Sequence, residues 1–229
     1  MSPSIYESKS SSIAQKIVMQ LASLGAFVVW FLYVGGDGVF ARWLGRETAA
    51  VDPVRRALLV GCSTIYGARL ILTQFHLVKR EIGWKEASTI AIWVIVIHLT
   101  MLYLGGTNPA RAGNATYVGA LFYVVGSFLN SGSELLRDAW KRRPENKGKL
   151  YTGGLFRYSI HMNYFGDFVL FTGFALVTGS VYAFAIPLVM MLLFVFVNIP
   201  MLDEYLAKHY GDAFVQYARR TAKLVPFVY

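Results

Sequence analysis

Long apolar segments separated by short polar ones run through this chain. Such a pattern is typical of helices that cross a membrane, each of which needs about 20 predominantly apolar residues. The fourth segment is short for a crossing, and we expect its helix to continue through 131–140 and carry a polar end out of the lipid. The apolar segments fall at about Ile17–Val34, Ala57–Val78, Ser88–Leu104, Thr116–Asn130, Tyr164–Thr178 and Val181–Met201.

The composition supports the same class. The chain is 55% hydrophobic and only 15% charged, with a mean hydropathy of +0.46, so a large soluble domain is excluded. Its 229 residues leave room for six or seven spans and short loops. The sequence therefore predicts an all-α, polytopic transmembrane bundle that forms a single domain over residues 1–229. The last two spans, joined only by 178–180, should form a tight hairpin.

Several kinds of chemistry are excluded by missing motifs. The single cysteine, Cys62, lies in an apolar stretch and cannot form an intrachain disulfide or a cysteine-ligated metal site. The sequence contains no HExxH, paired CxxC, GxSxG, Walker or GxGxxG motif, so we expect no metal and no Rossmann fold.

The positive charges predict the orientation. With six spans, 16 of the Lys and Arg residues fall on the side that holds both termini, and 5 fall on the other side. The positive-inside rule then places both termini in the cytoplasm. We expect the membrane to be that of the endoplasmic reticulum in a eukaryote, or the inner membrane in a bacterium. Topology and anionic lipid explain the net charge of +9, so no nucleic-acid partner is expected.

One stretch at a predicted membrane boundary, "GGLFRYSIHMNYFGDF" at 153–168, gathers many polar groups. Gly153 and Gly154 allow a turn, and Asn163 and Asp167 are four residues apart, so they share one face of a helix. An unpaired carboxylate followed by apolar residues would cost several kcal/mol. Asp167 therefore either pairs within the protein, for example with Arg157, or faces a functional pocket.

A similar pair ends the fourth span. Asn130 and Glu134 are again four residues apart, and the 131–163 loop that follows carries seven positive residues among aromatic ones. Carboxylate and carboxamide groups beside a basic loop suit a nucleotide, which has phosphates, ribose hydroxyls and amide groups. The alternative is that the basic loop only retains the topology.

The second span contains Tyr66 and Arg69, three residues apart on one face. An intramembrane guanidinium must face the bundle interior and find a partner. One reading is a structural ion pair. The functional reading makes Tyr66 a hydrogen-bond donor to a substrate oxygen, with Arg69 organising the site. His98 is expected to be an ordinary interfacial histidine.

These motifs resemble those of the membrane steroid 5-alpha-reductase family, in a wider superfamily with sterol reductases and isoprenylcysteine carboxyl methyltransferases. The GGLF turn leads into Asn163, Tyr164, Phe165, Gly166 and Asp167. The end of the chain matches the family's closing pattern at Asp203, Glu204, Tyr210, Gly211, Tyr217, Pro226 and Phe227. The resemblance is most specific over residues 130–229.

The resemblance implies an NADPH-dependent enzyme that reduces a carbon–carbon double bond in a steroid-like (3-oxo-4-ene) or other isoprenoid lipid. It implies a cytosol-facing cofactor pocket, a lipid substrate that enters from the bilayer, and a Tyr66 that polarises the substrate carbonyl, with Arg69 as the second catalytic residue. Tyr210 would close the pocket. The cofactor contacts would be Asn130, Glu134, Lys141, Lys149, Asn163, Asp167 and Tyr210.

The sequence also departs from the reductases. Those enzymes pair the tyrosine with an acid on the preceding helix, but 30–36 offers none, so either Asp37 or Glu47 reaches in or the acid is absent. Ile160 and Met162 replace the family's usual basic residue and proline beside the histidine. We also expect the chain to lack one N-terminal helix of the mammalian steroid enzymes. Two alternatives stay open: an isoprenylcysteine-type methyltransferase that uses S-adenosylmethionine, and a lipid-binding protein without catalysis.

Overall fold

The described part of the protein is almost entirely helical. The structure, a computed structural model, describes residues 12–35, 43 and 52–228. Within these ranges the chain forms no β-strand, and extended backbone pairs only in one isolated bridge between Ser159 and Ala222. The predicted all-α class is confirmed.

The helices form two compact units. Unit 1 contains the described residues up to Ala120 together with Phe174–Ala183, and unit 2 contains Leu121–Gly173 and the described residues from Phe184 onwards. A membrane domain can hold more than one compact helical unit. The single domain predicted over the whole chain therefore stays a prediction.

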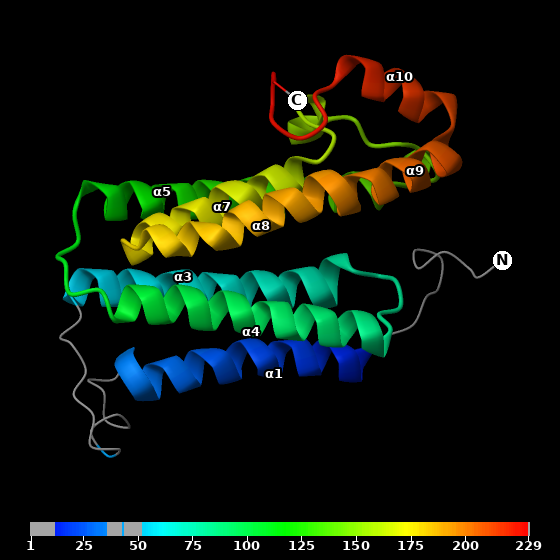
Figure 1. Ribbon diagram of the computed structural model, residues 1–229. Helices are drawn as coiled ribbons and strands as arrows, with labels where there is room; N and C mark the ends of the chain where they lie inside the picture. Colours follow the sequence, from blue (N-terminus) through cyan, green and yellow to red (C-terminus); the bar gives the residue numbers. More distant parts are fainter. Residues whose placement is uncertain (1–11, 36–42, 44–51, 229) are drawn as a thin grey trace. The chain divides into compact units, whose positions relative to one another are not determined.

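Unit 1 is built on three long helices that pack against one another (Figure 1). They are α1 (Ile13–Trp30), α3 (Pro53–Ile71) and α4 (Trp84–Gly106). The first two continue without a break into π-helical turns, at Phe31–Gly35 after α1 and at Leu72–Leu77 after α3.

A buried arginine fixes the start of α3. Asp52 caps the helix by accepting a hydrogen bond from the Arg55 main-chain N–H at 3.0 Å. The Arg55 side chain, only 2% exposed, donates to the carbonyl oxygens of Asn108 (3.2 Å) and Ala110 (2.6 Å) beyond the end of α4. It therefore provides partners for carbonyl groups of the loop that follows α4.

Unit 2 begins with one long helical stretch that changes character along its length. α5 (Asn114–Ser127) passes through a π-helical turn (Phe128–Gly132) into the polar α6 (Ser133–Lys141), which confirms the predicted continuation to Trp140. α5 and α7 each contribute residues to both units. The remaining elements are the 3₁₀ turns Pro144–Asn146, Gly154–Arg157 and Val181–Phe184, helices α7 (Met162–Thr178), α8 (Ala185–Leu193), α9 (Ile199–Tyr210) and α10 (Asp212–Arg220), and the π-helical turn Phe194–Asn198 between α8 and α9.

Two glycines let the backbones of unit 2 touch. A Cβ atom on Gly166 of α7 would lie 2.4 Å from the main-chain nitrogen of Asn130, and one on Gly126 of α5 would lie 2.3 Å from that of Leu170. Small residues at a helix crossing allow this close approach, as in many membrane helix pairs. The crossing brings the polar end of one helix beside the polar start of the other.

Among the described residues, four helical stretches are long and apolar enough to cross a membrane: Ile13–Tyr33, Pro53–Leu77, Trp84–Gly106 and Val181–Tyr210. Met162–Thr178 is apolar but shorter. All six predicted segments are helical, and the predicted tight turn before Val181 is confirmed, with Gly179 at φ +68°. The protein is an integral, polytopic helical membrane protein, and the orientation of its termini stays a prediction.

Candidate functional site

The two polar helix ends predicted separately from the sequence come together in unit 2. The Asn130 side chain donates a hydrogen bond through Nδ2 to the main-chain oxygen of Asn163 at 3.0 Å. Asn130 lies in the π-helical turn between α5 and α6. Turns of this kind inside α-helices are frequent at functional sites because they redirect side chains.

Glu134 and Asp167 bring two carboxylates to the same region. Glu134 forms an ion pair with Arg137 through one oxygen, while its Oε1 atom is buried and has no hydrogen-bond partner within the described ranges. Burial raises the pKa of Glu134, the positive charges of Arg137 and Lys141 oppose this rise, and the Asp167 charge adds to it. An acceptor of this kind suits a ligand that offers an N–H or O–H group.

Lys141 and Tyr210 join the end of α6 to the end of α9. Lys141 Nζ donates to the Tyr210 hydroxyl at 3.2 Å and lies 5.8 Å from the centre of its ring. Both residues line a cavity of about 40 Å³, whose other lining residues are Arg137, Leu150, Tyr151, Phe156, Ile160, Leu206 and Tyr217. The cavity therefore combines two cations and three phenols with an apolar floor.

Three of these lining residues were not predicted as site residues from the sequence, although Tyr217 belongs to the closing pattern. Arg137, besides pairing with Glu134, lies with its guanidinium 5.5 Å from the centre of the Phe156 ring. Tyr217 donates its hydroxyl to the Phe156 main-chain oxygen, and burial raises the pKa of Tyr217. Tyr151 packs edge-on against Phe156 at 5.8 Å. The spacing of Arg137, three residues after Glu134 on a strongly amphipathic helix, was the signal that could have found it.

A buried histidine, His161, fixes the start of α7. His161, 1% exposed, bonds through Nε2 to Asp203 Oδ1 at 2.9 Å, and Lys223 Nζ lies 3.4 Å from the other oxygen of Asp203. A main-chain hydrogen bond supports these contacts, because the His161 N–H donates to the Lys223 carbonyl at 3.1 Å. The histidine of the GGLF motif and the acid of the closing pattern thus hold α7, α9 and the C-terminal segment together.

Lys149 stays apart from the other predicted cofactor residues. Its side chain is exposed on the loop after Pro144–Asn146, and no hydrogen bond or ion pair joins that side chain to another described residue. Arg157, the alternative partner considered for Asp167, lies with its guanidinium 5.0 Å from the centre of the Tyr158 ring.

The two predicted catalytic residues lie in unit 1. Tyr66 and Arg69 are both half-buried on α3, and the Tyr66 ring meets His98 of α4 edge-on, with ring centres 4.8 Å apart. His98 is 1% exposed and bonds through Nδ1 to the Val94 carbonyl at 3.1 Å. A carbonyl only accepts, so Nδ1 carries the hydrogen and Nε2 of the neutral ring is an acceptor.

His98 therefore differs from the interfacial histidine that the sequence indicated. It is buried beside Tyr66, and its Nε2 has no hydrogen-bond partner in the part of the chain that the structure describes. The two acids considered as partners of Tyr66, Asp37 and Glu47, lie outside the described residues.

The fold and these clusters define a polytopic helical membrane protein with a polar cluster in one unit and a half-buried phenol, Tyr66, in the other. The chain belongs to a family described as "Protein of unknown function (DUF1295)", which matches residues 86–221. This family is part of the steroid 5-alpha-reductase/isoprenylcysteine methyltransferase superfamily, so the resemblance drawn from the motifs is confirmed. The matched range contains every predicted cofactor residue but neither Tyr66 nor Arg69.

Two similar proteins have names that point to different reactions. A "Probable O-methyltransferase ustE" from Ustilaginoidea virens is 37% identical over 105 residues, 45% of this chain and 36% of that protein. A "3-oxo-5-alpha-steroid 4-dehydrogenase 2" from Mus musculus is 29% identical over 112 residues, 49% of this chain and 42% of that protein. The matches cover less than half of either relative, so they support the superfamily and not one reaction or substrate.

Proposed function

We propose that this protein uses NADPH to reduce a carbon–carbon double bond conjugated to a carbonyl in a steroid-like or other isoprenoid lipid. The observation that carries the proposal is the cluster in unit 2. Arg137 and Lys141 line one cavity, and Glu134, which pairs with Arg137, has a buried oxygen without a hydrogen-bond partner among the described residues. Cations suit phosphate groups, and a buried acceptor suits a ribose hydroxyl or carboxamide N–H.

The residues fit the dinucleotide chemically, but the cavity must widen to take it. About 40 Å³ is far below the roughly 300–1,000 Å³ typical of sites for small organic ligands. The contact that closes it, between Lys141 and Tyr210, is exposed and involves two side chains at helix ends. NADPH binding would therefore separate Lys141 from Tyr210 and replace that hydrogen bond with contacts to a phosphate.

The chemistry assigned to the chain is positioning and charge stabilisation. When bound, NADPH would supply a hydride to the β carbon of the conjugated double bond and become NADP⁺, and a proton from solvent would complete the reduction at the α carbon. Tyr66 donates a hydrogen bond to the carbonyl oxygen, where negative charge develops, and one such donor in a dry site stabilises a transition state by about 3–4 kcal/mol. Arg69, on the same face of α3, keeps the surroundings of Tyr66 electropositive.

Methyl transfer from S-adenosylmethionine is the second candidate. It is favoured by the relative named as an O-methyltransferase, which has the higher identity of the two, 37% against 29%. The buried acceptor of Glu134 beside the Asp167 charge would also suit a cationic ligand. Against it stand Arg137 and Lys141 in the same cavity, since S-adenosylmethionine has a sulfonium cation and no phosphate.

A ligand comparison tests the proposal. Purified protein in detergent is heated with NADPH, NADH or S-adenosylmethionine, and only a ligand that binds the folded state raises Tm by mass action. We expect NADPH to raise Tm and to be consumed when a 3-oxo-4-ene steroid is added. Asn163→Ala and Asp167→Ala should each abolish the Tm rise, whereas Lys208→Ala, which changes a surface residue 75% exposed, should not.

The outcomes separate the candidates. A Tm rise with S-adenosylmethionine alone would contradict the reductase function and favour the methyltransferase. If no nucleotide raised Tm and the protein still bound a lipid, the result would favour a lipid-binding protein without catalysis.

A further inference from the structure

Unit 2 exposes a group of large apolar side chains where the segment after α10 meets the turn before α7. Phe227 is 86% exposed, Val228 is 81% exposed and Tyr158 is 38% exposed. The rings of Tyr158 and Phe227 contact each other, with centres 5.6 Å apart. The isolated bridge between Ser159 and Ala222 joins the two segments beside these rings. The exposed side chains therefore form one patch from two distant parts of the sequence.

The backbone holds Phe227 in this exposed position. Its φ is +66°, a left-handed conformation that is rare for a large side chain and costs free energy. The Val228 N–H donates to the Val225 carbonyl at 3.0 Å in the same turn, and the buried Ser159 hydroxyl donates to the Leu224 carbonyl at 2.7 Å. The chain thus keeps an aromatic ring exposed in a strained turn, which indicates a role for the ring outside the protein.

Two membrane-associated helices reach this patch. α7 begins at Met162, shortly after Tyr158, and its 17 residues are about 25 Å long, less than the roughly 30 Å of hydrocarbon in a bilayer. The candidate membrane-spanning stretch Val181–Tyr210 is followed directly by α10, which packs Tyr217 against Ile160. Residues that flank such helices lie at the level of the lipid headgroups, where aromatic side chains are favoured.

The surroundings of the patch are cationic. The stretches 150–160 and 213–228 contain no acidic residue and four positive ones: Arg157, Arg219, Arg220 and Lys223. Arg157 is exposed, and its guanidinium lies 5.0 Å from the centre of the Tyr158 ring. Lys223 lies against Asp203, whereas Arg219 and Arg220 are exposed in the last turn of α10. This charge complements a negatively charged partner.

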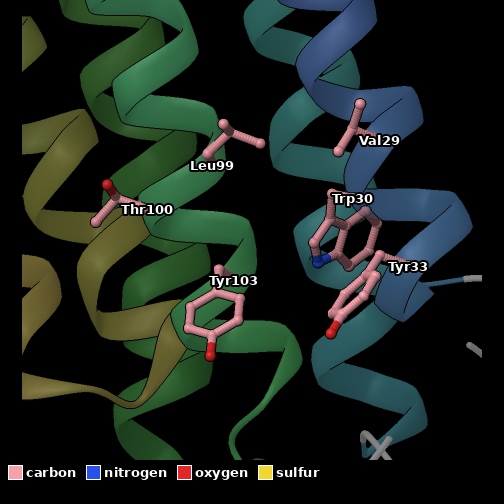
Figure 2. Close-up of a pocket in the computed structure, with 6 residues that line it drawn as sticks. All are labelled: Val29, Trp30, Tyr33, Leu99, Thr100 and Tyr103. Atoms are coloured by element: carbon pink, nitrogen blue, oxygen red, sulfur yellow. The ribbon is translucent and has the colours of Figure 1, made fainter. Parts of the chain in front are cut away.

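Unit 1 offers a comparison without a cation. A cavity of about 450 Å³ lies between α1, with the turn that follows it, and α4. Figure 2 shows its lining residues, none of which is charged: Val29, Trp30, Tyr33, Leu99, Thr100 and Tyr103. Aromatic rings without a cation cannot select a charged headgroup. The pairing of exposed rings with arginine therefore distinguishes the patch in unit 2 and points to a lipid phosphate.

We propose that Arg157, Tyr158, Phe227 and Val228 form a binding site for an anionic phospholipid of the surrounding membrane. Phe227 and Val228 contact the first carbons of the acyl chains, and Arg157 donates hydrogen bonds to the lipid phosphate. The arginines of α10 make the local potential positive, which favours a headgroup with a net negative charge. The site uses none of the residues assigned to the nucleotide or to the reaction.

A titration with soluble lipids tests this site. Purified protein in a neutral detergent receives dihexanoyl phosphatidylglycerol, dihexanoyl phosphatidylcholine or inorganic phosphate, and the rise in Tm gives the affinity for each. We expect the wild type to prefer phosphatidylglycerol over phosphatidylcholine by about tenfold, and inorganic phosphate to leave Tm unchanged. Arg157→Gln removes the guanidinium, so the preference should fall to about twofold or less.

Matched variants separate the two halves of the site from general effects. Phe227→Asn removes the ring with a residue that tolerates positive φ, so it should weaken both lipids by a similar factor, about five- to tenfold. Arg143→Gln removes the same charge from an exposed arginine outside the patch and should keep the wild-type preference. Tyr103→Ala removes an aromatic residue of unit 1 that is 55% exposed and should also keep it.

Several results would overturn the lipid site. An equal loss of preference in Arg143→Gln would mean that any surface charge serves. A Tm rise with inorganic phosphate as large as that with phosphatidylglycerol would assign Arg157 to a free anion. A wild-type dimer in light scattering that Phe227→Asn dissociates would assign the ring to a second copy of the chain. The Tm rise with NADPH, measured on Arg157→Gln, should equal that of the wild type, so the lipid site and the proposed function are tested independently.

Discussion

The two units of the protein differ in how their buried polar groups are hydrogen-bonded. In unit 2 the candidate cofactor residues mostly bond to one another, as Asn130 does to the Asn163 main chain and Lys141 does to Tyr210. In unit 1, buried ring nitrogens of Trp30 and His98 have no hydrogen-bond partner among the described residues. The first arrangement is a polar network, and the second is a set of single polar atoms among apolar helices.

This difference indicates what a ligand must do to bind in each unit. A ligand of unit 2 must break existing hydrogen bonds and replace them, so its affinity depends on charge-assisted contacts that exceed those lost. A ligand of unit 1 must displace packed side chains to reach either ring nitrogen, and then gains the benefit of pairing a buried group. Substitutions in the two units should therefore separate nucleotide affinity from events at the lipid.

The largest expected effect is on turnover. Tyr66→Phe removes the hydroxyl assigned to the substrate carbonyl, and we expect NADPH consumption with a 3-oxo-4-ene steroid to fall by about 10²–10³-fold. The NADPH affinity, measured by thermal shift, should stay unchanged because the cofactor residues lie in unit 2. An equal loss of NADPH affinity would contradict this division of roles.

The next effect is on stability. Gly166→Ala places a methyl group 2.4 Å from the Asn130 main-chain nitrogen, so the helices of unit 2 must move apart, at a cost of about 1–3 kcal/mol in the free energy of unfolding. Gly67→Ala on α3 is the matched control, because its methyl group would meet no atom within 4 Å. The Tm of both variants in detergent checks this, and equal Tm values would show that the crossing tolerates a side chain.

A smaller effect is expected on nucleotide affinity. Lys141→Met keeps the length of the side chain and removes its charge, and the loss of one charge-assisted hydrogen bond should weaken NADPH binding by about tenfold. Lys208→Met changes a lysine of α9 that pairs with Glu204 at the surface, so this substitution should have no effect. Titration of each variant with NADPH gives the comparison. Tighter binding by Lys141→Met would mean that the contact with Tyr210 only blocks the site.

The smallest effect concerns pH. Burial raises the pKa of Glu134 above its ordinary 4.5, so the folded state holds this proton more tightly than the unfolded chain does. The free energy of unfolding should therefore fall as the pH rises from about 4.5 through the folded-state pKa. Glu134→Gln cannot ionise, so its Tm should decline less over that range. A steeper decline than that of the wild type would show that the ionised form is the stabilised one.

Much of the fold could be predicted from local pattern. Apolar segments of about 20 residues can satisfy their backbone groups in lipid only as helices, so the predicted spans were found to be helical. The continuation of α5 into α6 was equally predictable, because Glu134, Arg137 and Lys141 keep one helical face polar. The division into two compact units had no signal in the pattern, because it depends on which helices pack together.

The candidate site was predictable only in part. Asn130, Asn163, Glu134 and Asp167 were paired from their spacing, but their meeting required the close backbone crossing at Gly166. Arg137 was overlooked because charges on an amphipathic helix usually face solvent. His98 and Trp30 gave no sequence signal at all, since whether a ring nitrogen has a partner depends on the neighbouring helix.

The sequence by itself determined the class of the protein, its helical spans, its family and the polar motif that begins α7, because these follow from composition, periodicity and local spacing. Only the tertiary structure decided that Lys141 lies against Tyr210, that His161 bonds to Asp203, and that the buried Trp30 ring nitrogen has no hydrogen-bond partner among the described residues. Each of these depends on side chains from segments far apart in the chain. Such meetings are fixed by packing, and the local sequence of either partner does not specify them.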